Sequence, residues 1–357
     1  MDRIQAHNFV VAADDPILVT GAAGFLGSRL IESLLDLGCR NIRCFVRPSG
    51  KQERLKDMQQ RHGEGLRLEI FHGNLLSKTD CREATRDIRV IYHLAAGTGE
   101  KSFPNAFMNS VITTRNLLDA TLQHGCLRRV VGVSSFTVYT NCNKTHGALL
   151  DETCPTEKHP EQRGEAYCFA KVKQEEMLME YADRFHMPLV IVRPGYVFGP
   201  GKKAISGRIG IDTFGFFLHL GGSNRIPLTY VDNCADAIAL AGLQDGVDGE
   251  IFNIVDDNLP SSRQFLRQYK SRVRRFRSIY IPHAISYSLC YLWEKYSAWS
   301  EGQLPPTFNR KDWFASWKST VYSNQKLKRL LGWTPRVSMA EGLNRYFEAC
   351  KNGAPHA

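Results

Sequence analysis

The chain has 357 residues, 43% of them hydrophobic and 23% charged, which allows an ordinary core in one large domain or two closely packed ones. Its first residues lack the pattern of a signal peptide, and no apolar run reaches the about 18 residues that cross a bilayer. The ten cysteines and eleven histidines show neither a disulfide framework nor a metal-binding spacing. We therefore expect a cytoplasmic protein without a bound metal. The net charge of +10 gathers partly in residues 270–277, and we expect a solvated face there rather than a nucleic-acid site.

The first half of the chain alternates short apolar runs with amphipathic stretches. We expect strands at 16–20, 41–46, 66–72, 90–94, 129–134 and 188–192, and long helices at 28–37 and 109–124. Strands that alternate with helices pair in parallel through crossover helices. The pattern predicts an α/β fold with a doubly wound parallel sheet.

After about residue 200, the regular alternation of apolar runs and amphipathic stretches becomes less clear. We expect strands at 226–231 and 251–255, and helices at 263–270 and 284–296. The sequence thus predicts a first part, residues 1–200, that carries the large sheet. A smaller second part, residues 201–357, would bind mainly substrate, with some segments returning to the sheet.

A glycine-rich turn joins the first strand to the first helix. Glycines at such a turn let the backbone approach a pyrophosphate, and the positive end of the helix favours its charge. A strand before, a helix after and a second strand about 20 residues on form the context of a dinucleotide site. The predicted cofactor-binding residues of this turn are Gly21, Ala23, Gly24, Phe25, Leu26 and Gly27.

The residue after the second strand selects between the two nicotinamide cofactors. An acidic side chain there would bind the ribose 2′-hydroxyl and repel a 2′-phosphate, but Arg47 occupies the position. Because arginine grips phosphate with paired hydrogen bonds, we favour NADP, and NAD stays open.

Tyr167 and Lys171 form a Y-x-x-x-K pattern, which places both side chains on one face of a helix. A lysine ammonium favours ionisation of a nearby phenol. We expect Tyr167 to exchange a proton with a substrate oxygen near neutral pH.

Several further segments occur in the order typical of one family. The glycine spacing is G-x-x-G-x-x-G, Ser134 and Ser135 follow the fifth strand, and residues 193–200 read R-P-G-Y-V-F-G-P. Together with Tyr167 and Lys171, they resemble the extended short-chain dehydrogenase/reductase family. The resemblance covers about residues 17–336. Within the family, the chain most resembles hydroxysteroid dehydrogenase-like and dihydroflavonol reductase-like members.

The resemblance implies a Rossmann sheet and assigns roles to residues. The catalytic residues would be Ser135, Tyr167 and Lys171. Further cofactor-binding residues would be Asn74, Leu75, Leu94, Ala95, Ala96, Asn109, Ser134, Pro194, Gly195 and Val197. Substrate contacts would come from Gly97, Phe136, Thr137 and Tyr196. Two positions depart from the family pattern, because Asn74 replaces a common aspartate and Thr140 replaces a glycine.

The implied reaction moves a hydride between nicotinamide and a ketone or alcohol carbon of a small molecule, with Tyr167 as general acid or base. Phe136 and Thr137 stand where dehydratases carry an acidic pair, which argues against dehydration. A nucleotide-sugar epimerase with retained NAD stays open, and Arg310 would then match a diphosphate-binding arginine. A non-catalytic NAD(P)-sensing protein is a third alternative.

The apolar segment 281–293 resembles the substrate-covering helix of the family, but a plain core helix is an equal alternative. Beside the basic run it would also suit a peripheral membrane contact, which we rank lower. By analogy alone, a homodimer would form through the helices of Asn109 and Tyr167.

Overall fold

The computed structural model describes residues 8–48, 50, 52–62, 65–97, 99–100, 102–141, 145–202, 205–213, 215–301, 303 and 308–352. Within these ranges no helix is both long enough and apolar enough to cross a membrane.

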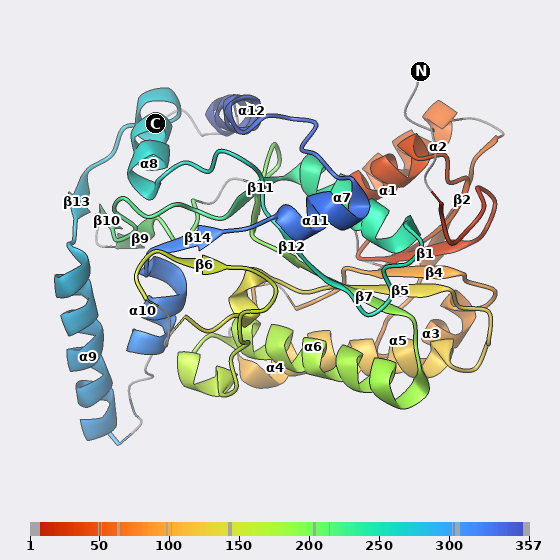
Figure 1. The fold of residues 1–357 in the computed structure, drawn as a ribbon, viewed down its shortest axis with the longest axis horizontal. Coiled ribbons are helices and arrows are strands. Elements are labelled where there is room, and N and C mark those ends of the chain that lie inside the picture. Colours follow the sequence, from red (N-terminus) through yellow and green to blue (C-terminus); the bar gives the residue numbers. More distant parts are fainter. Residues whose placement is uncertain are drawn as a thin grey trace.

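A parallel sheet of seven strands forms the centre of the molecule (Figure 1). Its order is β12-β7-β5-β4-β1-β2-β3, and every neighbouring pair is parallel. The strands are β1 (Ile17–Thr20), β2 (Asn41–Val46), β3 (Arg67–His72), β4 (Val90–His93), β5 (Arg129–Val133), β7 (Leu189–Pro194) and β12 (Ile251–Ile254). Strand β12 comes from the second part of the chain and joins the sheet beside β7. The predicted doubly wound Rossmann fold is confirmed.

Helices cover both faces of the sheet, so its central strands β1, β4, β5 and β7 are buried on both sides. One face packs against α1 (Gly27–Asp36), α2 (Glu53–His62), α7 (Val231–Leu243) and α11 (Gln325–Leu331). The other packs against α3 (Lys78–Ala84), α5 (Thr113–Thr121) and α6 (Ala166–Phe185). The strand order reverses between β1 and β4, and such a reversal leaves a crevice at the carboxyl ends of parallel strands.

Smaller sheets and helices lie beyond one end of the central sheet, on the left of Figure 1. The strands are β6 (Ala148–Leu150), β8 (Tyr196–Phe198), β9 (Gly210–Thr213), β10 (Phe216–His219), β11 (Leu228–Tyr230), β13 (Ser278–Tyr280) and β14 (Thr320–Tyr322). The helices are α8 (Ser262–Arg272), α9 (His283–Trp299), α10 (Arg310–Trp317) and α12 (Met339–Asn352). A second aromatic-rich core holds much of this part together.

Two differences between the predicted and observed element boundaries concern residues near the candidate site. The expected strand at 226–231 ends at Tyr230, and Val231 begins α7, with Asp232 at the positive end of the helix. Asn109 does not open its helix, because α4 (Phe103–Phe107) already begins six residues earlier. There the Ser102 side chain accepts a hydrogen bond from Asn105 N. Asn109 instead lies in the π-helical turn η2 (Met108–Ile112), which leads into α5.

Candidate active site

The glycine turn between β1 and α1 is closely packed around its glycines. Gly21 has a φ of +70°, and a Cβ added there would lie 3.2 Å from Ala95 N. A Cβ on Gly27 would lie 2.2 Å from Gly21 O, and Gly24 N donates to the same oxygen at 2.9 Å. No described side chain caps the first turn of α1, whose amide groups point toward this turn. With Ala23, Phe25 and Leu26 between the glycines, the turn fits a dinucleotide pyrophosphate.

The residues expected around the adenosine follow β2 and β3. Arg47 comes directly after β2, the neighbour of β1, and is exposed. Asn74 is also exposed, but its side-chain oxygen accepts a hydrogen bond from Leu76 N at 3.0 Å. The Leu75 side chain is buried in the core, which leaves only its backbone for a cofactor contact.

The residues after β4 lie against the glycine turn. Ala95 N donates to Thr20 Oγ1 at 3.2 Å, and Leu94 and Ala96 flank it in the same half-buried segment. Gly97 N donates to Ser110 Oγ at 3.0 Å. A Cβ on Gly97 would lie 3.1 Å from Asn109 Cβ, while Asn109 Nδ2 donates to Glu100 Oε1 at 2.9 Å. The segments at the carboxyl ends of β1 and β4 therefore pack against each other.

The predicted catalytic side chains of Ser135 and Tyr167 lie close together beyond β5, and Lys171 follows on the helix that carries Tyr167. The Ser135 hydroxyl lies near enough to the Tyr167 phenol to favour its ionisation. Ser135 Oγ also accepts from Thr137 N at 3.2 Å and so caps the 3-10 turn η3 (Phe136–Val138). Lys171 lies one turn after Tyr167 on α6, where its ammonium donates to Val133 O at 2.7 Å and to Gln174 Oε1 at 2.9 Å.

Burial dominates the ionisation of this group. It raises the pKa of Tyr167 to about 12, although the nearby Ser135 hydroxyl opposes the shift. It lowers the pKa of Lys171 to about 8, against the attraction of Glu175. The direction for Tyr167 is opposite to the lowering expected from a nearby lysine, so in this structure the phenol stays protonated at neutral pH.

A buried chain of polar side chains connects Lys171 with β1. Gln174 Nε2 donates to Thr114 Oγ1 at 2.8 Å, and the two nitrogens of His93 lie 2.8 Å from Thr114 Oγ1 and Thr20 Oγ1. Burial lowers the pKa of His93 to about 3, which keeps its ring neutral. Sequence reasoning missed Gln174 and Thr114, and the available signal was the position of Gln174 three residues after Lys171 on one helix.

The hydroxyl of Ser134 is engaged within the protein. It donates to Glu175, which forms a buried ion pair with Arg193. The Arg193 guanidinium lies 4.6 Å from the centre of the Tyr139 ring, and Tyr139 donates to Asn253 Oδ1 at 2.7 Å. These contacts join β5, β7 and β12 at the ends of the strands that border the site.

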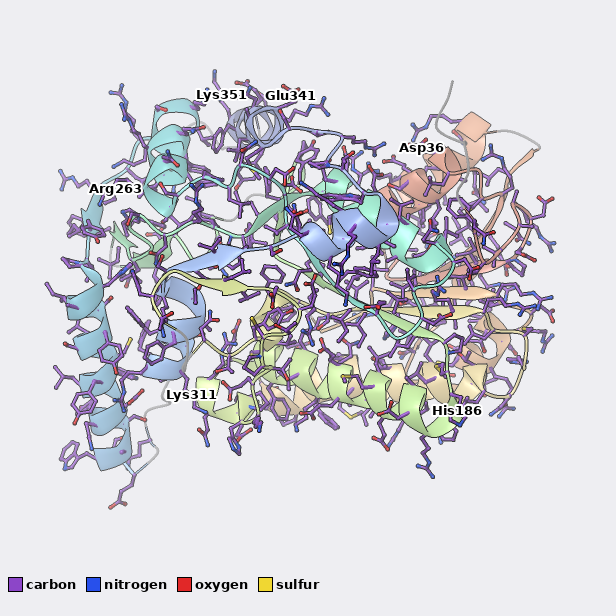
Figure 2. All side chains as sticks on the ribbon, viewed as in Figure 1. Asp36, His186, Arg263, Lys311, Glu341 and Lys351 are labelled. Carbon is purple, nitrogen blue, oxygen red and sulfur yellow. The ribbon has the colours of Figure 1, made fainter. Side chains whose placement is uncertain are left out.

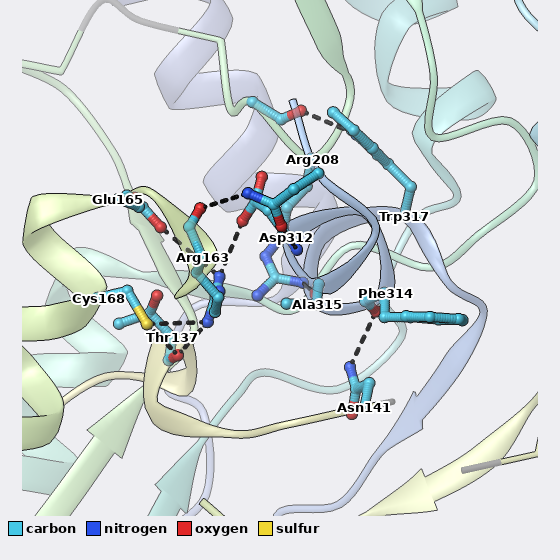
Figure 3. A network of polar contacts seen from close by, with 12 residues as sticks. Thr137, Asn141, Arg163, Glu165, Cys168, Arg208, Asp312, Phe314, Ala315 and Trp317 are labelled. Atoms are coloured by element: carbon cyan, nitrogen blue, oxygen red, sulfur yellow. Dashed lines mark hydrogen bonds and ion pairs between the residues drawn. The ribbon is translucent and has the colours of Figure 1, made fainter. Parts of the chain in front are cut away.

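The expected substrate residue Thr137 connects to α10 through a charged network, which Figure 3 shows around Arg163. The buried guanidinium of Arg163 donates to Thr137 O at 2.6 Å and to Asp312 Oδ1 at 3.0 Å. It also donates to the Cys168 thiol at 3.0 Å. Phe136 is buried and stacks on Tyr322, with ring centres 5.7 Å apart.

The segment after β7 places a cation between the glycine turn and Tyr196. The ammonium of Lys202 lies 4.3 Å from the Tyr196 ring centre and 5.9 Å from that of Phe25, and it donates to Val197 O at 3.1 Å. Pro194 ends β7, and Gly195 N donates to Ile254 O at 2.9 Å. A Cβ on Gly195 would lie 2.2 Å from Pro227 O, so this position also requires glycine.

The model of the NAD dependent epimerase/dehydratase family matches residues 17–255, the part of the chain that carries the glycine turn, Ser135, Tyr167 and Lys171. The chain belongs to this family. A cinnamoyl-CoA reductase of Oryza sativa subsp. japonica is 31% identical over 56% of the chain and 58% of its own length. A sterol-4-alpha-carboxylate 3-dehydrogenase (decarboxylating) of Saccharomyces cerevisiae is 27% identical over 93% of the chain and 96% of its own length.

Solved structures of family members share the fold. UDP-glucuronic acid 4-epimerase of Bacillus cereus, in complex with NAD, covers 94% of this chain and 99% of its own, with a TM-score of 0.68 and 22% identity. The predicted family is confirmed. The dehydrogenases and reductases among the sequence relatives also bear out the predicted enzyme class, an NAD(P)-dependent oxidoreductase.

Proposed function

We propose that the protein interconverts a ketone or aldehyde and the matching alcohol on a fairly apolar small molecule, with Ser135, Tyr167 and Lys171 as catalytic residues. The observation that carries the proposal is the closeness of the Ser135 and Tyr167 hydroxyls, next to a glycine turn that fits a pyrophosphate. Two hydroxyls held together in this way can converge on one carbonyl oxygen.

The roles follow from the protonation states and places of these side chains. A bound nicotinamide supplies or accepts the hydride. Tyr167, protonated at neutral pH because burial raises its pKa to about 12, donates a proton to the developing alkoxide. Ser135 donates a hydrogen bond to the same oxygen, and Lys171 would hold the cofactor ribose. A phenol with a raised pKa suits reduction of a carbonyl better than oxidation of an alcohol.

The cofactor is proposed to be NADP. Arg47 is exposed beside the glycine turn, at the end of the strand adjacent to β1, where it can bind a 2′-phosphate. Gly21, Gly24 and Gly27 would hold the pyrophosphate. The residues after β4 and β7 would border the nicotinamide half, while Ser134 would act through its contact with Glu175.

The substrate is proposed to be apolar rather than a nucleotide sugar. Arg310, which an epimerase would need for a diphosphate, pairs with Glu294 at 2.8 Å and lies 4.8 Å from the Tyr291 ring centre. Relatives named for sterol and hydroxysteroid substrates match over 93% of the chain. We propose residues 201–357 as mainly the substrate-binding region, and a homodimer through α5 and α6 as its assembly.

A substrate panel followed at the nicotinamide absorbance tests the proposal directly. Apolar ketones such as 3-oxosteroids and aromatic aldehydes should consume NADPH in proportion to product, and Y167F should abolish the consumption. Interconversion of UDP-sugars without net cofactor change would replace the proposal by epimerisation. Cofactor binding without turnover of either class would indicate a sensor.

A further inference from the structure

Helix α9 presents an apolar face to the outside of the molecule. Ile285, Leu289, Leu292, Tyr296 and Trp299 are spaced three or four residues apart, so they share one side of the helix. They are between 49% and 77% exposed. We call these five residues the outer face of α9. This side of α9 does not belong to the described core.

The opposite side of α9 fixes the helix to the rest of the protein. Ser286 and Cys290 are buried there, and Trp313 of α10 donates to Ser286 Oγ at 2.9 Å. Tyr287 packs edge-on against Trp313, with ring centres 5.3 Å apart. Figure 2 shows α9 along the left edge of the molecule, with side chains that project away from the other elements. The orientation of the outer face is therefore set by packing.

Aromatic rings cluster at the carboxyl end of this face. The rings of Tyr296 and Trp299 stack with centres 5.7 Å apart, and Trp293 lies 6.2 Å from Tyr296 and 5.9 Å from Phe308. Tryptophan and tyrosine combine an apolar ring with a polar group. Both residue types are enriched where hydrocarbon meets water at a membrane surface.

The segment that leads into α9 is cationic. Four exposed arginines precede β13 in the sequence: Arg272, Arg274, Arg275 and Arg277. Ile279 and Tyr280 of β13 continue the exposed apolar surface, and Arg263 lies 5.5 Å from the Tyr280 ring centre. Figure 2 places Arg263 at the same edge as α9. The carboxylate of Glu294 on α9 forms an ion pair with Arg310.

We propose that this edge docks on an anionic phospholipid bilayer, with α9 lying in the plane of the membrane surface. An apolar helix face with aromatic residues would enter the boundary between headgroups and acyl chains, and the arginines would bind anionic headgroups. A second copy of the chain complements the edge less well. A twofold contact uses the same patch on both subunits and would bring the cationic edge against itself. The proposal is independent of the reaction proposed above.

Flotation of the full chain with vesicles tests the docking. The protein should float with vesicles of equal parts phosphatidylcholine and phosphatidylserine, and much less with phosphatidylcholine alone. L289E/L292E should lower the bound fraction at least about tenfold, since two exposed leucines lose their apolar burial. R274A/R275A should lower binding about tenfold to the phosphatidylserine vesicles only. The matched control L76E/L122E changes two exposed leucines of the Rossmann part and should bind like the wild type.

Several results would overturn the docking proposal. One is a wild-type protein that stays with the soluble fraction, and another is an equal loss in the control. A change of solution mass in L289E/L292E, measured by light scattering, would show that α9 contacts a second copy instead. Should L289E/L292E lose its cooperative thermal unfolding, W299S provides the same test, because the Trp299 side chain is 77% exposed.

Discussion

The ammonium of Lys171 donates a 2.9 Å hydrogen bond to the side-chain oxygen of Gln174, one turn further along α6. Through Thr114 and His93, this bond connects the catalytic helix with β1, the strand that leads into the glycine turn. Both halves of the site are thus held by one buried polar chain.

Gln174 is predicted to position Lys171. Q174L removes the acceptor and leaves Thr114 with one partner fewer, so we expect kcat to fall about tenfold, because the ammonium loses its orientation. The unfolding free energy should fall by about 1–2 kcal/mol. Steady-state kinetics and urea unfolding measure the two effects.

The matched variant Q174E separates positioning from structure. It keeps an acceptor for Lys171 and adds a negative charge that favours the ammonium, so the alkaline limit of activity should move to higher pH. An equal loss of kcat in both variants with an unchanged pH profile would mean that Gln174 is merely structural.

The reduction rate should fall as pH rises through about 8, the value to which burial lowers the pKa of Lys171. The sign follows because the charged form of lysine is present below its pKa, while the Tyr167 phenol stays protonated throughout this range. K171R keeps a positive charge to much higher pH and should lose this decline, whatever its absolute rate. A wild-type kcat/KM that is flat well above pH 8 would contradict the assignment.

The cofactor proposal predicts a selective effect of R47D. The substitution removes a charge-assisted phosphate contact, so the Kd for NADPH should rise about 10- to 100-fold while that for NADH changes little. Fluorescence titration of both cofactors measures the effect. R61D on α2 makes the same charge change at an exposed site and serves as control. Equal weakening of the two cofactors by R47D would refute the role of Arg47.

The ion pair between Arg163 and Asp312 is predicted to stabilise the attachment of α10. D312A leaves the buried guanidinium of Arg163 with Thr137 O, the Cys168 thiol and, among the described carboxylates, Glu165 at 3.6 Å. We expect a loss of about 2–3 kcal/mol, below the value for fully buried pairs because Asp312 is partly exposed. Thermal or urea unfolding measures it. D312N, which keeps a hydrogen-bond acceptor, should lose less, and equal stability of D312A and wild type would show that the pair contributes nothing.

Much of the Rossmann half was predictable because its signals are local. The strand at 41–46 was predicted to the residue, and the Y-x-x-x-K pattern placed Tyr167 and Lys171 one turn apart on α6. The start of α4 was missed, although Ser102 and Pro104 form a recognisable helix beginning. The π-helical turn at Asn109 has no comparable sequence signal.

The remaining features depend on contacts between distant segments. Gln174 meets Thr114 from another helix, and Arg163 meets Asp312 across 149 positions of sequence. The pKa of Tyr167 was expected to fall because Lys171 is near in sequence, whereas burial, which only the fold determines, raises it. The sequence pattern also did not predict that the outer face of α9 is exposed, because a core helix would show the same helical pattern.

A double-mutant cycle of S135A and Y167F tests the central claim most directly, with kcat for reduction as the quantity measured. If both hydroxyls act on one carbonyl oxygen, Y167F should lose at least about 100-fold, and S135A/Y167F should be little slower than Y167F. Cofactor affinity should be unchanged in all three variants. A fully active Y167F, or losses that multiply as for independent sites, would contradict the account.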